Sequence, residues 1–163
     1  RQMCIRDRVR AERDNDTGET SEVRGLTVDG FEIELKGRVN DGLNLAIAYS
    51  DLSGETSSGG IPREIPEHTL SAFAAWEVNE KLSVALGLTQ QGESKIKDNT
   101  PGLVLPEYTR VDLSAYYQVA PNLSVQMNVE NLMDELYFPH SHSTHQASVG
   151  ESVNSRVSLR WTY

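Results

Sequence analysis

The chain has 163 residues, of which 37% are hydrophobic and 24% charged, and its net charge is −9. The excess of 24 acidic over 15 basic residues excludes nucleic acid as a partner, because phosphate binding needs a basic surface. No apolar run approaches the roughly 18 residues of a transmembrane helix. The mean hydropathy of −0.47 is typical of a soluble domain. A membrane β-barrel gives a similar average, since only alternate residues of its strands face lipid.

The first eight residues, RQMCIRDR, resemble a translated sequencing adapter. We therefore expect residues 1–8 to be non-native and residues 9–163 to be the protein's own sequence; the alternative is a genuine strand end. Cys4 is the only cysteine, so the remainder is predicted to have no disulfide or thiolate chemistry. The acidic stretch Glu12–Glu22 follows and is predicted to be a loop.

From Phe31 to the C-terminus, apolar residues recur at every second position, which predicts β-strands. The apolar positions carry no charge, whereas the alternate positions include Glu, Asp, Lys and Arg. About seven such segments follow one another along the chain. They cover residues 31–39, 43–49, 70–78, 82–88, 111–119, 123–129 and 155–163.

The connections between these segments alternate between short and long. Short turns are typical of one end of an outer-membrane barrel and long loops of the other, and loops this long are uncommon in compact soluble domains. We therefore predict an antiparallel transmembrane β-barrel fragment, with a soluble β-sandwich as the alternative, because both bury one face of each strand. The short turns are residues 40–42, 79–81 and 120–122, and the long loops lie near 52–67, 91–107 and 132–151.

Aromatic residues on the apolar face gather near the short turns, where an interfacial girdle would lie: Trp76, Tyr117, Trp161 and Tyr163. The last two also end the alternating row of the final strand. That ending resembles the signal read by the bacterial barrel-assembly machinery; the alternative is an ordinary last strand.

Four segments resemble, in order, landmarks of TonB-dependent outer-membrane receptors. Residues 137–143 (YFPHSHS) and 149–151 (VGE) are most similar to ferric catecholate siderophore receptors. The family's usual glycine–x–proline–arginine before the last strand is replaced by GESVNSR, which departs from the pattern. The four landmarks are residues 27–34 (TVDGFEIE), 65–69 (IPEHT), 105–112 (LPEYTRVD) and 128–137 (NVENLMDELY).

The resemblance implies an all-β fold, the C-terminal strands of a barrel with about 22 strands and a plugged lumen. It places the protein in the outer membrane of a Gram-negative bacterium, in contact with lipid and lipopolysaccharide. It implies uptake of a ferric siderophore, driven by the TonB complex through a plug region that is not in this chain. The alternatives are a TonB-dependent receptor for haem, cobalamin, a metal chelate or a saccharide, or a passive porin.

Ferric catecholate complexes are anionic, so cationic and aromatic side chains near the long loops are the expected contacts. The acidic stretch Glu12–Glu22 would instead repel an anion; it is expected either to bind cations that bridge lipopolysaccharide or to have no specific role. The candidate ligand-binding residues are Arg63, Tyr108, Phe138, His140 and His142.

His140, His142 and His145 are spaced closely enough to hold Zn²⁺ or Cu²⁺. They lie in a long loop with no acidic or cysteine ligand beside them, so we expect solvated histidines, no metal and no cofactor. His68 and Asp112 are the candidates for catalysis. No nucleophile stands at a strained turn beside them, so no enzyme is predicted.

The remaining motif residues favour structural roles. Arg110 and Asp112 are two apart and point to the same side of a strand, where such pairs form charge ladders that fix register. Asn131 and Asp134 follow a strand and are predicted to cap the turning backbone. Tyr137, like Tyr108, is predicted at the loop end of the strands, where it faces ligand or closes the rim.

Overall fold

The computed structural model of the chain describes residues 8–13, 20–56, 59–97 and 102–163. Residues 1–7, most of the segment predicted to be non-native, lie outside these ranges. No helix in the described part of the chain is long and apolar enough to cross a membrane. The strands are β1 (Arg8–Arg13), β2 (Thr20–Arg38), β3 (Leu43–Glu55), β4 (His68–Glu77), β5 (Leu82–Gln91), β6 (Ser94–Lys95), β7 (Val104–Leu105), β8 (Tyr108–Ala120), β9 (Leu123–Glu130), β10 (His140–Ser143), β11 (Gln146–Ser148) and β12 (Asn154–Trp161).

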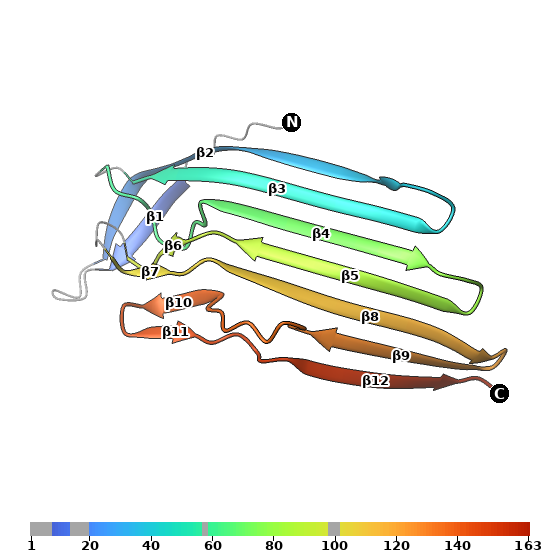
Figure 1. Cartoon of the computed structure of the whole chain (residues 1–163). Coiled ribbons are helices and arrows are strands. Elements are labelled where there is room, and N and C mark those ends of the chain that lie inside the picture. The colour runs from blue at the N-terminus through green and yellow to red at the C-terminus, as the bar shows by residue number, and fades with distance from the viewer. Residues whose placement is uncertain (1–7, 14–19, 57–58, 98–101) are drawn as a thin grey trace.

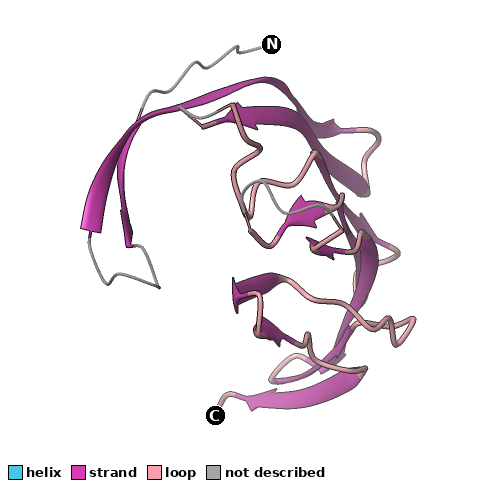
Figure 2. Ribbon diagram, turned by 90° about the vertical axis from the view of Figure 1, so that its left-hand side faces the viewer, coloured by secondary structure: helices cyan, strands magenta, loops and turns pink. Residues whose placement is uncertain are grey.

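Eight of these strands form one antiparallel sheet in the order β1-β2-β3-β4-β5-β8-β9-β12 (Figure 1). Two ribbons, β6–β7 and β10–β11, form separate two-stranded sheets. Seen along the strands, the large sheet curves as an arc, and both ribbons lie on its concave side (Figure 2). The long connections therefore fold inward over the concave face.

All seven predicted strands are present, as β2, β3, β4, β5, β8, β9 and β12, and the antiparallel pairing is confirmed. The sheet has one strand more, β1, which pairs with the first half of β2 from Arg13↔Thr20 to Arg8↔Leu26. The prediction of a loop over Glu12–Glu22 is therefore wrong at both ends of that stretch, because backbone pairing forms strands there although apolar residues are sparse. Residues 14–19 lie outside the described ranges.

The strand register places the apolar positions side by side across the sheet. Leu35 pairs with Ile47, Ile47 with Ala72, Ala72 with Leu88, and Leu88 with Val111. A shift of one residue at any seam would turn the apolar positions to the opposite face. The period of two read from the sequence therefore continues through all five strands.

The residues that alternate with these apolar positions form a second row, on the opposite face of the sheet. Glu34 pairs with Ala48, Ala48 with Ser71, Ser71 with Thr89, and Thr89 with Arg110. This polar row is on the concave side of the arc, because Arg110 contacts a long loop that folds over that side. The polar face is therefore the inner face of the arc and the apolar face the outer one.

The sheet has almost no hydrophobic core of its own. Among the described residues only Leu105 and Tyr137 are buried hydrophobic side chains, whereas Leu35, Leu159 and Trp161 on the outer face are 61–72% exposed. Apolar patches of this extent are rare on soluble monomers. The outer face thus needs an apolar environment that the chain does not provide.

The short connections lie together at one end of the sheet, called here the turn end (Figure 1). Two of them are closed by an asparagine side chain. The Asn40 Oδ1 accepts the N–H groups of Gly42 and Leu43, both at 2.9 Å. The Asn79 Oδ1 accepts those of Lys81 and Leu82 at 2.9 and 3.0 Å. Asparagine favours such turns because its short side chain reaches the backbone two residues ahead.

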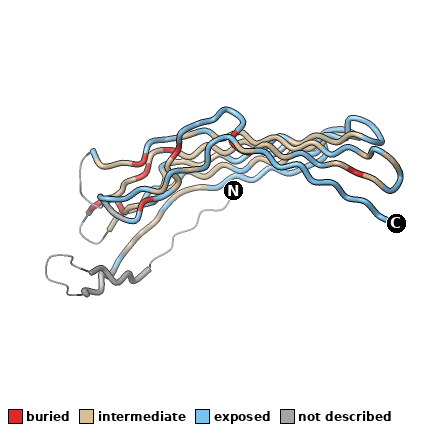
Figure 3. The backbone as a smooth tube through the Cα atoms, turned by 90° about the horizontal axis from the view of Figure 1, so that it is seen from below, coloured by how far each residue is buried: buried red, intermediate tan, exposed pale blue. Residues whose placement is uncertain are grey.

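The long connections, residues 56–67, 92–107 and 131–153, lie at the opposite end, called here the loop end. They contain β6, β7, β10 and β11, which the alternating pattern did not predict. Buried residues gather at this end (Figure 3). Among the residues whose burial the structure describes (25–56, 59–97, 102–142 and 144–163), they are Gly60, Pro62, Gly92, Ser94, Leu105, Asn131, Tyr137 and Ser141, with only Ser124 buried at the turn end.

Candidate functional site

Glu64 joins the three long connections at the loop end. Its backbone N–H donates to the Lys95 carbonyl in β6 at 2.8 Å, and its Oε1 accepts the Ser141 N–H in β10 at 3.2 Å. Its φ of 58° is in the left-handed region, which is unusual for a residue other than glycine. One residue of the 56–67 loop therefore holds both inner ribbons.

Arg63, a predicted ligand residue, lies next to Glu64 and is half-buried. Its Nη1 donates to the carbonyl of His142 at 3.5 Å. The structure thus brings Arg63 and His142 together, although 79 residues separate them. A guanidinium carries five N–H donors on a planar cation, a geometry that suits hydrogen bonding to anions.

The β10–β11 ribbon presents its histidines to the surface. His140, His142 and His145 are all exposed. The His140 Nε2 lies 2.9 Å from the Ser148 hydroxyl on the facing strand. The His142 and His145 rings meet edge to face with centroids 5.8 Å apart. In the part of the chain that the structure describes, no group of three or more His, Cys, Asp or Glu is placed to hold a metal ion.

Tyr108 opens β8 and packs on Tyr137, with ring centroids 4.7 Å apart. Its hydroxyl donates to the Gln91 Oε1 at 3.3 Å. Tyr137 is 6% exposed. Phe138, which follows Tyr137 in the chain and is one of the predicted ligand residues, is half-buried. Of the two tyrosines predicted at the rim, Tyr137 therefore closes the rim from within.

Arg110 and Asp112 form an ion pair with each other on the concave face, with the Arg110 Nη2 2.9 Å from the Asp112 Oδ2. The Arg110 Nη1 donates to the Tyr137 hydroxyl at 3.2 Å. The Asp112 Oδ1 accepts the backbone N–H of Asn131 at 2.9 Å. Instead of continuing a ladder across strands, the pair ties β8 to the 131–153 loop.

Asn131 is 1% exposed and is the centre of the loop's base. Its Oδ1 accepts the Glu135 N–H, and its Nδ2 donates to the carbonyls of Glu135 and Glu151, all at 2.9 Å. The Asp134 Oδ1 accepts the Val153 N–H at 2.9 Å. The prediction of a cap on the turning backbone is confirmed for Asn131, whereas the Asp134 side chain instead holds backbone 19 residues further along the chain. The bonds to Glu151 and Val153 had no signal in the sequence, because they join the two ends of a long loop.

A cleft of about 370 Å³ lies beside this base. It contains one cation, Arg110, and two carboxylates, Glu130 and Glu151, so its charge does not favour an anion. Of the predicted ligand residues none lines it. Its full lining is Arg110, Glu130, Asn131, Tyr137, Pro139, Val149, Gly150, Glu151 and Asn154.

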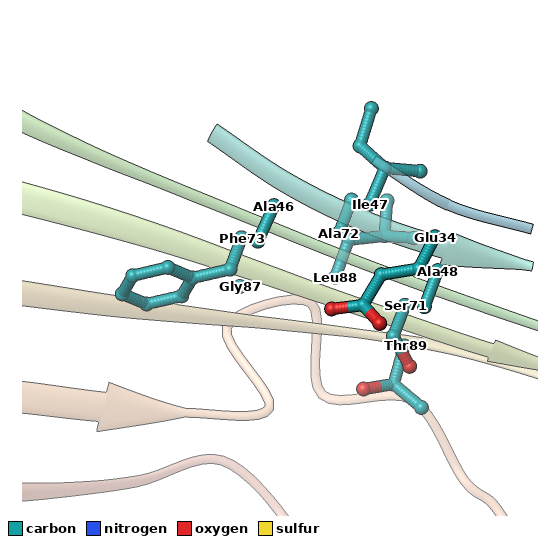
Figure 4. Close-up of a pocket in the computed structure, with 10 residues that line it drawn as sticks. All are labelled: Glu34, Ala46, Ile47, Ala48, Ser71, Ala72, Phe73, Gly87, Leu88 and Thr89. Atoms are coloured by element: carbon teal, nitrogen blue, oxygen red, sulfur yellow. The ribbon is translucent and has the colours of Figure 1, made fainter. Parts of the chain in front are cut away.

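A second hollow, of about 290 Å³, lies on the concave face midway along β2–β5 (Figure 4). Its floor is made of small side chains, including Ala46, Ala48 and Gly87, with Phe73 on one side. The Glu34 carboxylate is on the other side. None of the predicted ligand residues is among its lining, so this hollow is distinct from the loop end.

His68, which we considered for catalysis, lines a third cleft of about 490 Å³ with Glu67, Glu93 and Glu107. Its ring is so close to Gly92 that a Cβ there would lie 2.7 Å from the His68 Nδ1. Asp112, the other residue considered, is bonded to Arg110 and Asn131. The structure therefore does not bring His68 and Asp112 into one site.

Comparison with known proteins identifies the family. The model of the family described as TonB dependent receptor-like, β-barrel, matches residues 5–132. The metal-pseudopaline receptor CntO of Pseudomonas aeruginosa (strain UCBPP-PA14) is 30% identical over 144 residues, which cover 82% of this chain and 20% of CntO. The chain thus spans about a fifth of the length of such curated relatives.

Two solved structures share the fold. The ferripyoverdine receptor of the P. aeruginosa outer membrane, bound to ferripyoverdine, superposes with a TM-score of 0.77 at 27% identity and covers 93% of this chain and 23% of that one. The ferric-catecholate import receptor Fiu of E. coli K12 has a TM-score of 0.74 at 22% identity, covering 91% and 22%. The chain belongs to the TonB-dependent receptor-like β-barrel family, and its eight-stranded sheet is part of such a barrel.

Proposed function

We propose that the receptor containing this chain takes up a ferric siderophore across the outer membrane in a TonB-dependent manner. The observation that carries the proposal is the placement of the β10–β11 ribbon. It lies at the loop end on the concave side of a barrel wall and is tied to Arg63 and Glu64. Receptors of known ligand among the relatives, such as the ferripyoverdine receptor, share this wall.

The proposed contacts are Arg63, Tyr108, Phe138, His140 and His142. A guanidinium attracts an anionic complex through charge-assisted hydrogen bonds, and aromatic rings offer apolar surface to a planar chelator. The carboxylate of the neighbouring Glu64 accepts the Ser141 N–H, which offsets part of its negative charge at the rim. Part of the proposed effect of Tyr108 on ligand binding comes from the packing of its ring on Tyr137.

Binding of iron-labelled siderophores to outer-membrane vesicles that contain the intact receptor tests this function. We expect saturable binding of a ferric catecholate, and weaker binding of a ferric hydroxamate of similar size. Absence of binding of any ferric siderophore would contradict the proposal. Preference for the hydroxamate would still support siderophore uptake, but it would exclude catecholates as the preferred ligand class.

A metal chelate of another kind is the second candidate, because His140, His142 and His145 are exposed on one small ribbon. Imidazole nitrogen suits Zn²⁺, Cu²⁺ and Ni²⁺ better than it suits iron held by catecholates. CntO is a metal-pseudopaline receptor by name. Competition between a ferric catecholate and a zinc or nickel chelate at the same vesicles separates the two candidates, since the true ligand displaces the other.

The remaining partners follow from the family and the exposed outer face. We propose that membrane lipid covers the apolar rows, and that the TonB complex supplies energy through a plug segment that this chain does not contain. Lipopolysaccharide, bridged by cations, is the proposed partner of the acidic stretch Glu12–Glu22. That assignment rests on composition, because the side chains of this stretch lie outside the described part of the chain.

A further inference from the structure

The 131–153 loop is divided by one backbone hydrogen bond. The Gly150 N–H donates to the Tyr137 carbonyl at 2.8 Å, which closes residues 138–149 into a projecting hairpin. This hairpin contains β10 and β11 and presents Phe138, His140 and His142. The pair Tyr137 and Gly150 is therefore the base of the hairpin.

Tyr137 is held from three sides. Tyr108 packs on its ring at 4.7 Å, and the Arg110 guanidinium donates to its hydroxyl at 3.2 Å. On the third side is Gly150, where an added Cβ would lie 2.2–2.4 Å from atoms of the Tyr137 ring. Real Cβ atoms do not approach this closely, so residue 150 has to be glycine unless the ring moves.

The contacts of Tyr137 lead directly to the barrel wall. Arg110 is held by Asp112 through its Nε and Nη2, at 3.2 and 2.9 Å from the Asp112 Oδ2. Asp112 in turn accepts the Asn131 N–H. Tyr108, Arg110 and Asp112 all lie in β8, an interior strand of the sheet between β5 and β9. The hairpin base is thus fixed to the wall and not only to its own loop.

The hairpin needs such an anchor. Its two strands have four and three residues, and an isolated two-stranded hairpin is at best marginally stable in water. Most of its described side chains are exposed, so it gains little from burial. Order in this segment has to come from the Tyr137 base and from the contacts with Arg63 and Glu64.

We propose that Tyr137, enclosed by Tyr108, Arg110 and Gly150, is a positioning residue that sets the direction of the hairpin and thereby its affinity for ligand. The inference rests on the proposed function, in which the hairpin contacts the ligand. Fixing the hairpin in advance lowers the entropy that binding must remove. The Tyr137 side chain itself, being buried, positions and does not contact the ligand.

Gly150→Ala in the intact receptor tests the proposal. We expect the Kd for the ferric siderophore to rise about tenfold, the cost of ordering one or two further side chains. Backbone amides of residues 138–149 should exchange hydrogen faster, while the amount of heat-modifiable, assembled barrel stays unchanged. Gly37→Ala is the matched control, because nothing lies within 4 Å of a Cβ at Gly37.

Tyr137→Phe covers the case in which Gly150→Ala does not assemble. It retains the ring and removes only the hydroxyl that Arg110 binds, so we expect a rise in Kd of about threefold. Unchanged Kd in an assembled variant, or unchanged exchange in the hairpin, would overturn the proposal. If the wild-type receptor binds no ferric siderophore, the proposed function fails, and faster exchange in Gly150→Ala still supports the anchoring of the hairpin.

Discussion

The two ends of the sheet are built by different means. At the turn end two of the three short connections are closed by an asparagine of the turn itself, Asn40 and Asn79. At the loop end the contacts join residues far apart in the chain, such as Arg63 with His142 and Asp112 with Asn131. Burial follows the same division, since nearly all buried residues of the described ranges lie at the loop end.

The comparison indicates that the long-range stabilising contacts are concentrated at the end of the sheet where the proposed ligand contacts lie. A turn that only reverses the strand needs two or three residues and one side-chain cap. The loop end holds exposed histidines and an arginine in position with few buried hydrophobic side chains, Leu105 and Tyr137, and relies largely on buried polar networks. Such networks are costly when incomplete, so each member should matter more than a member of a turn.

The largest effect is expected in the wall between the two ends. Leu86→Arg places a charge on the outer face of β5, and we predict a loss of about 2–4 kcal/mol in the free energy of unfolding in lipid vesicles. Gln126→Arg, on the concave face and already exposed, is the matched control and should change it by less than about 0.5 kcal/mol. Equal effects of both substitutions would show that lipid does not cover the outer face.

Asn131→Ala, at the loop end, should cause the next largest loss of stability. It removes three hydrogen bonds of a fully buried side chain and places alanine at a φ of 51°. We predict a loss of about 2–3 kcal/mol, because two backbone carbonyls and an N–H lose their partner when the buried amide is removed. Thermal unfolding of the receptor in micelles measures it.

Asn131→Gly separates the two causes, since glycine accepts the positive φ but has no amide. If Asn131→Gly were as stable as the wild type, backbone conformation and not the hydrogen-bond network would explain the residue. We expect Asn131→Gly to recover less than half of the stability that Asn131→Ala loses.

The smallest effect is expected at the turn end. Asn79→Ala removes two local hydrogen bonds in an exposed turn, and we predict a loss of about 0.5–1 kcal/mol with no change in ligand affinity. The same micelle unfolding and vesicle binding experiments check both values. A change in affinity after Asn79→Ala would contradict the division between the two ends.

Much of the wall could be predicted from the sequence. The period of two predicted all seven strands between Phe31 and the C-terminus. The structure adds the register, in which pairs such as Leu35↔Ile47 and Leu88↔Val111 join apolar positions. β1 was missed, since Arg8–Arg13 is short and mostly charged. β10 and β11 were missed because histidine and serine give no alternation of apolar residues.

The candidate site could be predicted only in part. Composition indicated Arg63, His140 and His142, and the structure adds that Arg63 and His142 meet. The contact of Glu64 with Ser141 and that of Gly150 with Tyr137 had no signal in the sequence, because folding brings these residues together. Long-range contacts of this kind cannot be read from spacing in a single sequence.

The central claim is that the loop end recognises an anionic ferric siderophore. Two arginines allow a direct test, because Arg63 donates to the His142 carbonyl at the loop end and Arg38 to the Asn40 carbonyl at the turn end. The measurement is the Kd of a ferric catecholate for the intact receptor carrying Arg63→Gln or Arg38→Gln. We predict a rise of about tenfold for Arg63→Gln, the loss of one charge-assisted contact, and no change for Arg38→Gln. Equal Kd values for both variants and the wild type would contradict the account.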